Sequence, residues 1–114
     1  MPTMVVTGIM AGILLAACLD PAPALRFDAS VPDDLRTLAG ETWQDFLAIH
    51  SARWDCIAPV TLSAAWELDS RGEYRPEPAT VVVRVPGTAS TLRSELIHEF
   101  AHHVEFTCPD QENL

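Results

Sequence analysis

Residues 90–106 have the period of an amphipathic helix, and this segment constrains the fold more than any other. Two histidines, His98 and His102, fall one turn apart on a face of their own. The segment therefore predicts a helix over Ser90–Phe106 that buries one wall and presents histidines on another. Four apolar residues recur at intervals of four and form the wall: Leu92, Leu96, Phe100 and Val104.

The rest of the chain predicts one further helix and two strands. Apolar residues recur at helical spacing over Pro32–Arg53. The alternating run Pro59–Glu67 and the valine-rich run Thr80–Val85 predict strands. The linker between them is too short for a crossover helix, so we expect an antiparallel β-hairpin. The predicted fold class is a small α+β domain over residues 32–114.

The C-terminal helix contains His98, Glu99 and His102 in the pattern His-Glu-x-x-His. Side chains four residues apart on a helix lie on one face, so the two histidines can bind one metal ion. In zinc peptidases, the glutamate of this pattern takes a proton from the attacking water. Catalytic zinc normally has three protein ligands and a water, so the pattern supplies two ligands and a base.

The order of strand, loop and motif helix over about residues 60–106 resembles the zincin metallopeptidases. In that family an edge strand lines the substrate cleft and the following helix carries the motif. The resemblance implies that His98 and His102 bind Zn²⁺ and that Glu99 is the general base in hydrolysis of a peptide or protein substrate. The metal would lower the pKa of its water towards about 7 and polarise the scissile carbonyl.

A third zinc ligand is missing from the places where the two main zincin branches have it. In the metzincin pattern, the positions of a glycine and a third histidine hold Glu105 and Cys108. In the gluzincin branch the third ligand is a glutamate on a later helix, which would fall beyond the given sequence. Three readings remain: the sequence is a piece of a longer gluzincin-like protein, which we favour; Asp110 or Glu112 completes the site; or the site is degenerate.

Four other polar residues near these elements have simpler interpretations. Tyr74 lies in a polar stretch at 69–78 and is either a turn residue or an oxyanion donor as in some zincins. His103 points about 100° away from His102, which predicts a surface or supporting role. His50 is predicted to be exposed. Glu105 lies seven residues after His98, about 10 Å along the helix axis, too far to share its metal.

The first 31 residues predict export. Residues 1–17 contain no charged side chain, and their apolar run is shorter than the about 20 residues of a membrane span, so they fit a signal peptide. The run ends in Leu15-Ala16-Ala17-Cys18, which resembles the lipobox of bacterial lipoproteins. We expect residues 18–31 to be a lipidated Cys18 and a tether that anchors the protein to the cell envelope. The alternative is a buried N-terminal helix in a cytosolic protein.

Cys56 and Cys108 remain as an even pair, which predicts one disulfide in an oxidising compartment. Closing this loop would stabilise the fold by about 4 kcal/mol on the chain-entropy model. The alternative, two free thiols in a reduced protein, requires that the chain is not exported.

The formal charge of -9 argues against nucleic acid as a partner and against adsorption to anionic membranes, leaving the lipid as the membrane contact. The leading hypothesis is an envelope-anchored zinc metallopeptidase domain. The alternative is a non-catalytic surface lipoprotein that binds a partner and carries a degenerate metal site. A third hypothesis, metal capture without hydrolysis, needs only His98 and His102.

Overall fold

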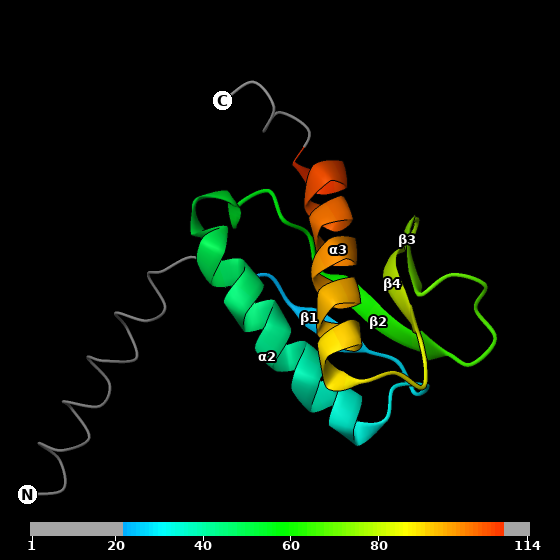
Figure 1. The fold of residues 1–114 in the computed structure, drawn as a ribbon. Coiled ribbons are helices and arrows are strands. Elements are labelled where there is room, and N and C mark those ends of the chain that lie inside the picture. Colours follow the sequence, from blue (N-terminus) through cyan, green and yellow to red (C-terminus); the bar gives the residue numbers. More distant parts are fainter. Residues whose placement is uncertain (1–21, 109–114) are drawn as a thin grey trace, which may run out of the picture.

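The computed structural model describes residues 22–108 and shows, within them, two α-helices, a short 3₁₀ helix and a four-stranded mixed sheet (Figure 1). A small α+β domain is therefore confirmed. The predictions for residues 1–17, Cys18, Asp110 and Glu112 lie outside the described residues. The elements are β1 (Leu25–Phe27), α2 (Asp33–Ile49), the 3₁₀ helix (Ser51–Arg53), β2 (Val60–Ala65), β3 (Gly72–Pro76), β4 (Ala79–Arg84) and α3 (Ala89–Thr107).

The strand order β1-β2-β4-β3 overturns the predicted antiparallel pairing of the two sequence-predicted strands. Strands β2 and β4 are neighbours but run parallel, in a register that places Leu62 opposite Val81. The polar stretch between them contains β3, which returns antiparallel to β4 and forms the hairpin. The strand in the linker runs back in the opposite direction, so the two parallel strands can be neighbours without a crossover helix between them. Strand β3 is then one edge of the sheet.

Strand β1 lies in the segment that the sequence predicts as a tether. It pairs parallel to β2, with Leu25 opposite Val60 and Phe27 opposite Leu62. The indole Nε1 of Trp43 donates to the carbonyl of Pro23 over 2.9 Å and holds the segment against α2. Three residues are too short a run to reveal strand alternation in a sequence. The domain therefore begins before residue 32.

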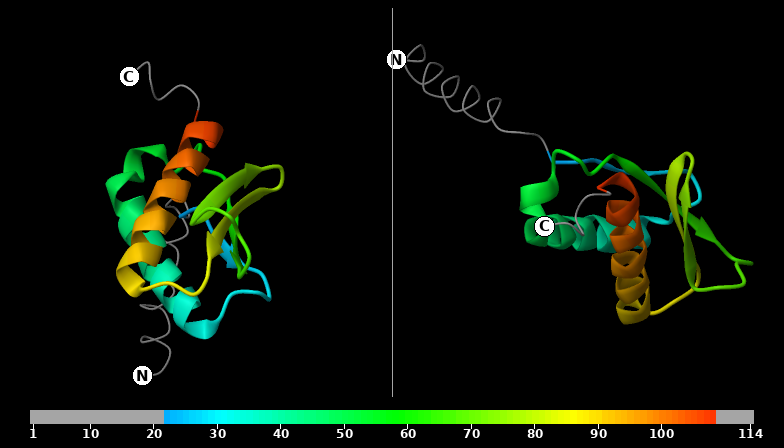
Figure 2. Two further views of the ribbon diagram at one scale, coloured as in Figure 1. Left: turned by 45° about the vertical axis from the view of Figure 1, so that its right-hand side comes forward. Right: turned by 90° about the horizontal axis from the view of Figure 1, so that it is seen from above.

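Both helices cover the same face of the sheet and lie side by side, giving two layers (Figure 2). The first helix ends at Ile49, and the 3₁₀ helix continues over Ser51–Arg53, so the predicted helix to Arg53 is two elements. Helix α3 begins one residue before the predicted range Ser90–Phe106 and ends one residue after it. Neither helix, nor any other described, is long and apolar enough to cross a membrane.

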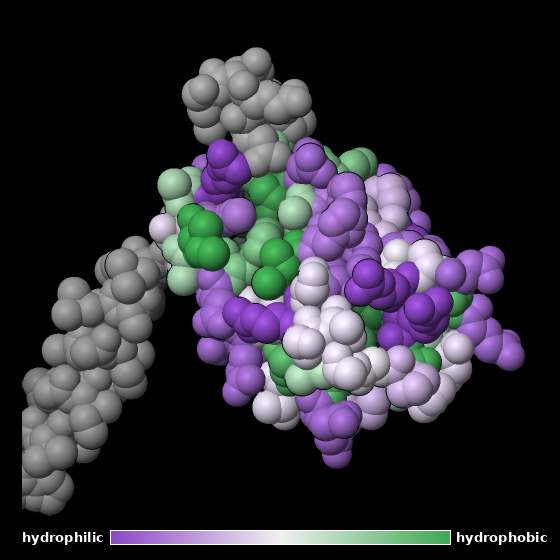
Figure 3. Space-filling model, in the orientation of Figure 1, coloured by the Kyte–Doolittle hydropathy of each residue, from purple (hydrophilic) through white to green (hydrophobic). Residues whose placement is uncertain are grey.

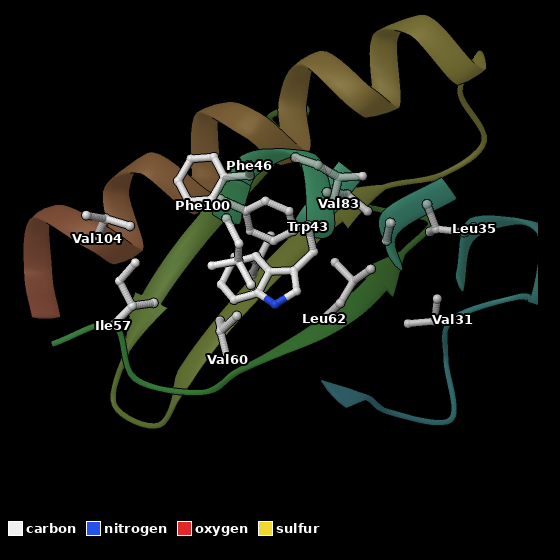
Figure 4. Close-up of a cluster of buried hydrophobic side chains, with 14 of the residues drawn as sticks. Val31, Leu35, Trp43, Phe46, Ile57, Val60, Leu62, Val83, Phe100 and Val104 are labelled. Atoms are coloured by element: carbon white, nitrogen blue, oxygen red, sulfur yellow. The ribbon is translucent and has the colours of Figure 1, made fainter. Parts of the chain in front are cut away.

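The core lies between the helices and the sheet and is centred on three aromatic rings (Figure 4). Trp43 meets Phe100 edge-on at a centroid distance of 4.7 Å, and Phe46 lies 5.7 Å from Phe100. Such contacts couple α2 to α3 directly. The sheet contributes the fully buried side chains Val60, Leu62, Val81 and Val83.

Candidate metal centre

The His-Glu-x-x-His motif lies in the middle of α3, and a capping box fixes where that helix begins. The Thr88 hydroxyl accepts from the backbone N–H of Thr91, and the Thr91 hydroxyl accepts from that of Thr88. With this start, the apolar wall turns inward and the two histidines turn outward. Leu96, Phe100 and Val104 are buried, whereas His98 and His102 are exposed.

The structure brings the rings of His98 and His102 together, and each ring faces the other with its Nε2 nitrogen. Their Nε2 atoms lie 3.2 Å apart, with the ring planes at 87° to each other. Two unprotonated imidazole nitrogens repel at this separation, so the arrangement favours a proton or a cation between them. Two nitrogens bound 2.0–2.1 Å from a tetrahedral zinc ion would lie about 3.3–3.4 Å apart. The pair therefore fits a shared zinc ion.

An open pocket of about 640 Å³ lies where α3 faces the edge strand β3. In the space-filling view, hydrophilic side chains gather on the α3 and β3 side of this face (Figure 3). No Lys or Arg is among the described residues that line the pocket, whereas three glutamates are. The walls are Gly72, Glu73, Tyr74, Pro76, His98, Glu99, His102, Glu105 and Phe106.

Glu99 borders this pocket but is only 4% exposed. Burial raises the pKa of its carboxyl to about 8, and the neighbouring Glu95 adds to this by a hydrogen bond and by its charge. The charge of Glu73 acts in the same direction. A cation bound at the histidines would oppose this shift and favour the carboxylate.

Gly72 on β3 allows α3 to approach the edge strand closely. A Cβ at this position would lie 2.7 Å from Oε2 of Glu95 and 2.8 Å from its Cγ. The absent side chain thus leaves room for Glu95, which in turn is the hydrogen-bond partner of Glu99. Nothing in the sequence pattern alone pairs a turn glycine with this glutamate.

His103 is fully buried, so of its two predicted roles the surface position is wrong and the supporting role stays a prediction. Its Nε2 donates to the carbonyl of Ala58 over 2.6 Å, so its Nδ1 accepts from the hydroxyl of Tyr74 over 2.7 Å. Burial lowers the pKa of the imidazole and favours this neutral form. Tyr74 lies on β3 rather than in a turn. The sequence held a signal for the burial of His103. This residue is seven positions after Leu96 and therefore lies about 20° from it around the helix, close to the apolar wall.

Glu105 does not reach the space between the histidines but contacts the outer side of His102. Its Oε1 lies 2.9 Å from Nδ1 of that ring. The i,i+3 spacing of a histidine and a glutamate on a helix is the sequence signal for this contact. His50, which the sequence predicts as exposed, is instead half-buried and stacks on Phe46 at a centroid distance of 4.3 Å.

Cys56 and Cys108 form a disulfide, with their Cα atoms 5.4 Å apart. A bonded Cys108 has no thiolate to offer a metal ion. Within residues 22–108, no three His, Cys, Asp or Glu side chains are grouped so that they could hold a metal ion together. The described part of the chain thus brings together two candidate ligands, His98 and His102, in no larger group of this kind.

No protein-family model, no curated protein and no solved structure matches this chain.

Proposed function

We propose that this protein is a zincin-like, zinc-dependent peptidase domain that hydrolyses peptide bonds with activated water. His98 and His102 hold the zinc ion and Glu99 is the general base. The protein is exported and is held at the outer side of a bacterial membrane by a lipid on Cys18.

The observation that carries the proposal is the 3.2 Å separation of the two Nε2 atoms at the wall of an open pocket. This separation is close to that of two zinc ligands, and the pocket gives a substrate access to the same point. Glu99 lines that pocket beside His98. The proposed ligands and the proposed base thus border one space.

The position of β3 also supports a zincin-like layout. This strand is the edge of the sheet, runs antiparallel to β4 and lines the pocket opposite the motif helix. An edge strand beside the motif is the arrangement that the family resemblance implies. A free edge offers backbone groups with which an extended peptide can pair.

A bound zinc ion would supply Lewis acidity, which polarises a carbonyl and makes water acidic enough to react near neutral pH. The protein's own part is to place a base and to shield it. Glu99 is buried, shares a hydrogen bond with Glu95, and borders the pocket. Its carboxylate can therefore take a proton from a water in the pocket and return it to the leaving amine.

The third zinc ligand in this proposal comes from outside residues 22–108, because no described group of three could hold a metal ion. Asp110 and Glu112 are the candidates in the given sequence, a few residues beyond the end of α3. Zinc titration of variants with Asp110→Ala and Glu112→Ala tests each of them directly.

The proposal is tested by zinc titration and then by a peptidase assay on the purified protein. We expect zinc binding that is lost in His98→Ala and His102→Ala and retained in His50→Ala, a histidine outside the pocket. The zinc-loaded protein should cleave members of a broad peptide pool, and a chelator should stop it. Glu99→Gln should abolish cleavage and spare zinc binding, whereas Glu41→Gln on the exposed face of α2 should change neither. A folded, zinc-loaded protein that cleaves nothing would contradict the proposal.

The second candidate function is a non-catalytic surface lipoprotein with a degenerate metal site. The observation in its favour is that the described residues bring only two ligands together. Under this alternative, Glu99→Gln would leave every measurable property of the protein except its stability unchanged.

A further inference from the structure

Both ring nitrogens of His102 are engaged, each by a different kind of partner. Nδ1 lies 2.9 Å from Oε1 of Glu105, and Nε2 lies 3.2 Å from Nε2 of His98. The carboxylate and the second imidazole are therefore on opposite sides of one ring.

The contact with Glu105 selects the tautomer of His102. An ionised carboxylate only accepts hydrogen bonds, so Nδ1 of the imidazole carries the hydrogen and donates it. Nε2 is then left with its lone pair, directed at the space shared with His98. A metal ligand needs this form of the ring.

The same contact also restrains the orientation of the ring, which is held by little packing. The His102 side chain is 48% exposed and that of Glu105 is 65% exposed. An exposed imidazole turns freely about its side-chain torsions unless a hydrogen bond holds it. In the part of the chain that the structure describes, no hydrogen bond holds Nδ1 of His98, so this restraint acts on one histidine of the pair.

We propose that Glu105 is the positioning residue of the candidate metal centre: by accepting a hydrogen bond from Nδ1–H of His102, it directs Nε2 towards the space beside His98. The proposal rests on the proposed function only for the identity of the ion. Residues that support a metal-bound histidine in this way typically change metal affinity 10–100-fold when removed. Because this pair is partly solvated, we expect the lower end, about tenfold.

The first test uses the metal-free protein. Nitrogen-15 NMR of the imidazole rings at about pH 8, above the ordinary pKa of a histidine in a peptide, reports which nitrogen carries the hydrogen. We expect the Nδ1–H form for His102 in the wild type and a shift towards the Nε2–H form in Glu105→Ala. Glu105→Gln should keep the wild-type form, because its amide oxygen still accepts. An identical tautomer in wild type and Glu105→Ala would overturn the proposal.

The second test is zinc affinity, measured by competition with a chelator. Glu105→Ala should weaken binding about tenfold, Glu105→Gln should restore most of the loss, and Glu41→Ala should bind as wild type. Unchanged affinity in Glu105→Ala would overturn the proposal for metal binding. Absence of zinc binding in wild type, together with the expected tautomer change, would refute the proposed function and uphold the positioning of the ring by Glu105.

Discussion

The hydroxyl of Tyr74 donates a hydrogen bond to Nδ1 of His103 over 2.7 Å, which connects the edge strand β3 to the inner side of the motif helix. His103 in turn donates to the carbonyl of Ala58 over 2.6 Å. The first hydrogen bond thus holds one side of the candidate pocket to α3, and the second holds α3 to the loop before β2. Among residues 22–108, strand β3 has one neighbouring strand, so this contact is an important restraint on its position.

Tyr74→Phe should destabilise the protein by about 1–3 kcal/mol, because it leaves the buried Nδ1 of His103 without a donor. Urea denaturation measures the change. Amide hydrogen exchange in β3 should become faster, while exchange in β2 should follow only the global loss of stability. Wild-type stability together with wild-type exchange in β3 would show that this hydrogen bond contributes nothing.

Gly72→Ala should lower the free energy of unfolding and displace Glu95, because the new Cβ would lie 2.7 Å from its Oε2. Gly40→Ala is the matched control, since nothing lies within 4 Å of a Cβ at that helical position. The control should instead gain about 0.5–1 kcal/mol, because alanine favours a helix over glycine. Equal gains in both variants, measured by thermal unfolding, would mean that β3 and α3 are not in close contact.

Reduction of the disulfide should cost about 4 kcal/mol of stability, since the bond joins cysteines 52 residues apart. The measurement is denaturation with and without reductant. A double variant, Cys56→Ala with Cys108→Ala, should be as unstable as the reduced wild type and insensitive to reductant. If reductant leaves the wild type unchanged, the two thiols are not bonded in solution.

Asp28→Asn should remove a stabilisation that the wild type loses in acid. The hydroxyls of Ser30 and Ser63 donate to the carboxylate of Asp28 and, with the charge of Arg36, hold its pKa below the usual range. A carboxylate with a lowered folded-state pKa stabilises the fold above about pH 4 and loses that contribution as the pH falls.

The difference in stability between the wild type and Asp28→Asn should therefore be largest near neutral pH and shrink as the pH falls below about 4. Denaturation at a series of pH values measures it. Asp55→Asn, which alters an exposed aspartate outside this network, is the control for the loss of one surface charge. A difference for Asp28→Asn that is independent of pH would count against the network.

The helices could be predicted from the sequence because their signals are local. The interval of four from Leu92 to Val104 gave α3 to within one residue, and the motif gave the pair His98 and His102. The sequence has three cysteines, so the expectation that Cys18 carries a lipid left Cys56 and Cys108 as the pair for a disulfide. Each of these inferences needs only spacing along the chain.

The sheet could not be predicted in the same way, because its partners are chosen in three dimensions. Strand β3 has the composition of a turn, with Gly72 and Pro76 at its ends, and its pairing with β4 changes the direction of β2 relative to β4. The burial of His103 likewise depends on Tyr74 from that strand. Contacts between distant segments carry little signal in a single sequence.

Strands β1 and β3 are opposite edges of the sheet, and the pocket lies at the β3 edge. The described chain enters through β1, three strand spacings or about 14 Å away. A lipid attached upstream, on Cys18, would therefore pull on the side of the molecule remote from the pocket. With that anchor, strand β3 would be free to meet a macromolecule approaching from bulk solvent, and the order of the four strands would set which way the candidate site faces.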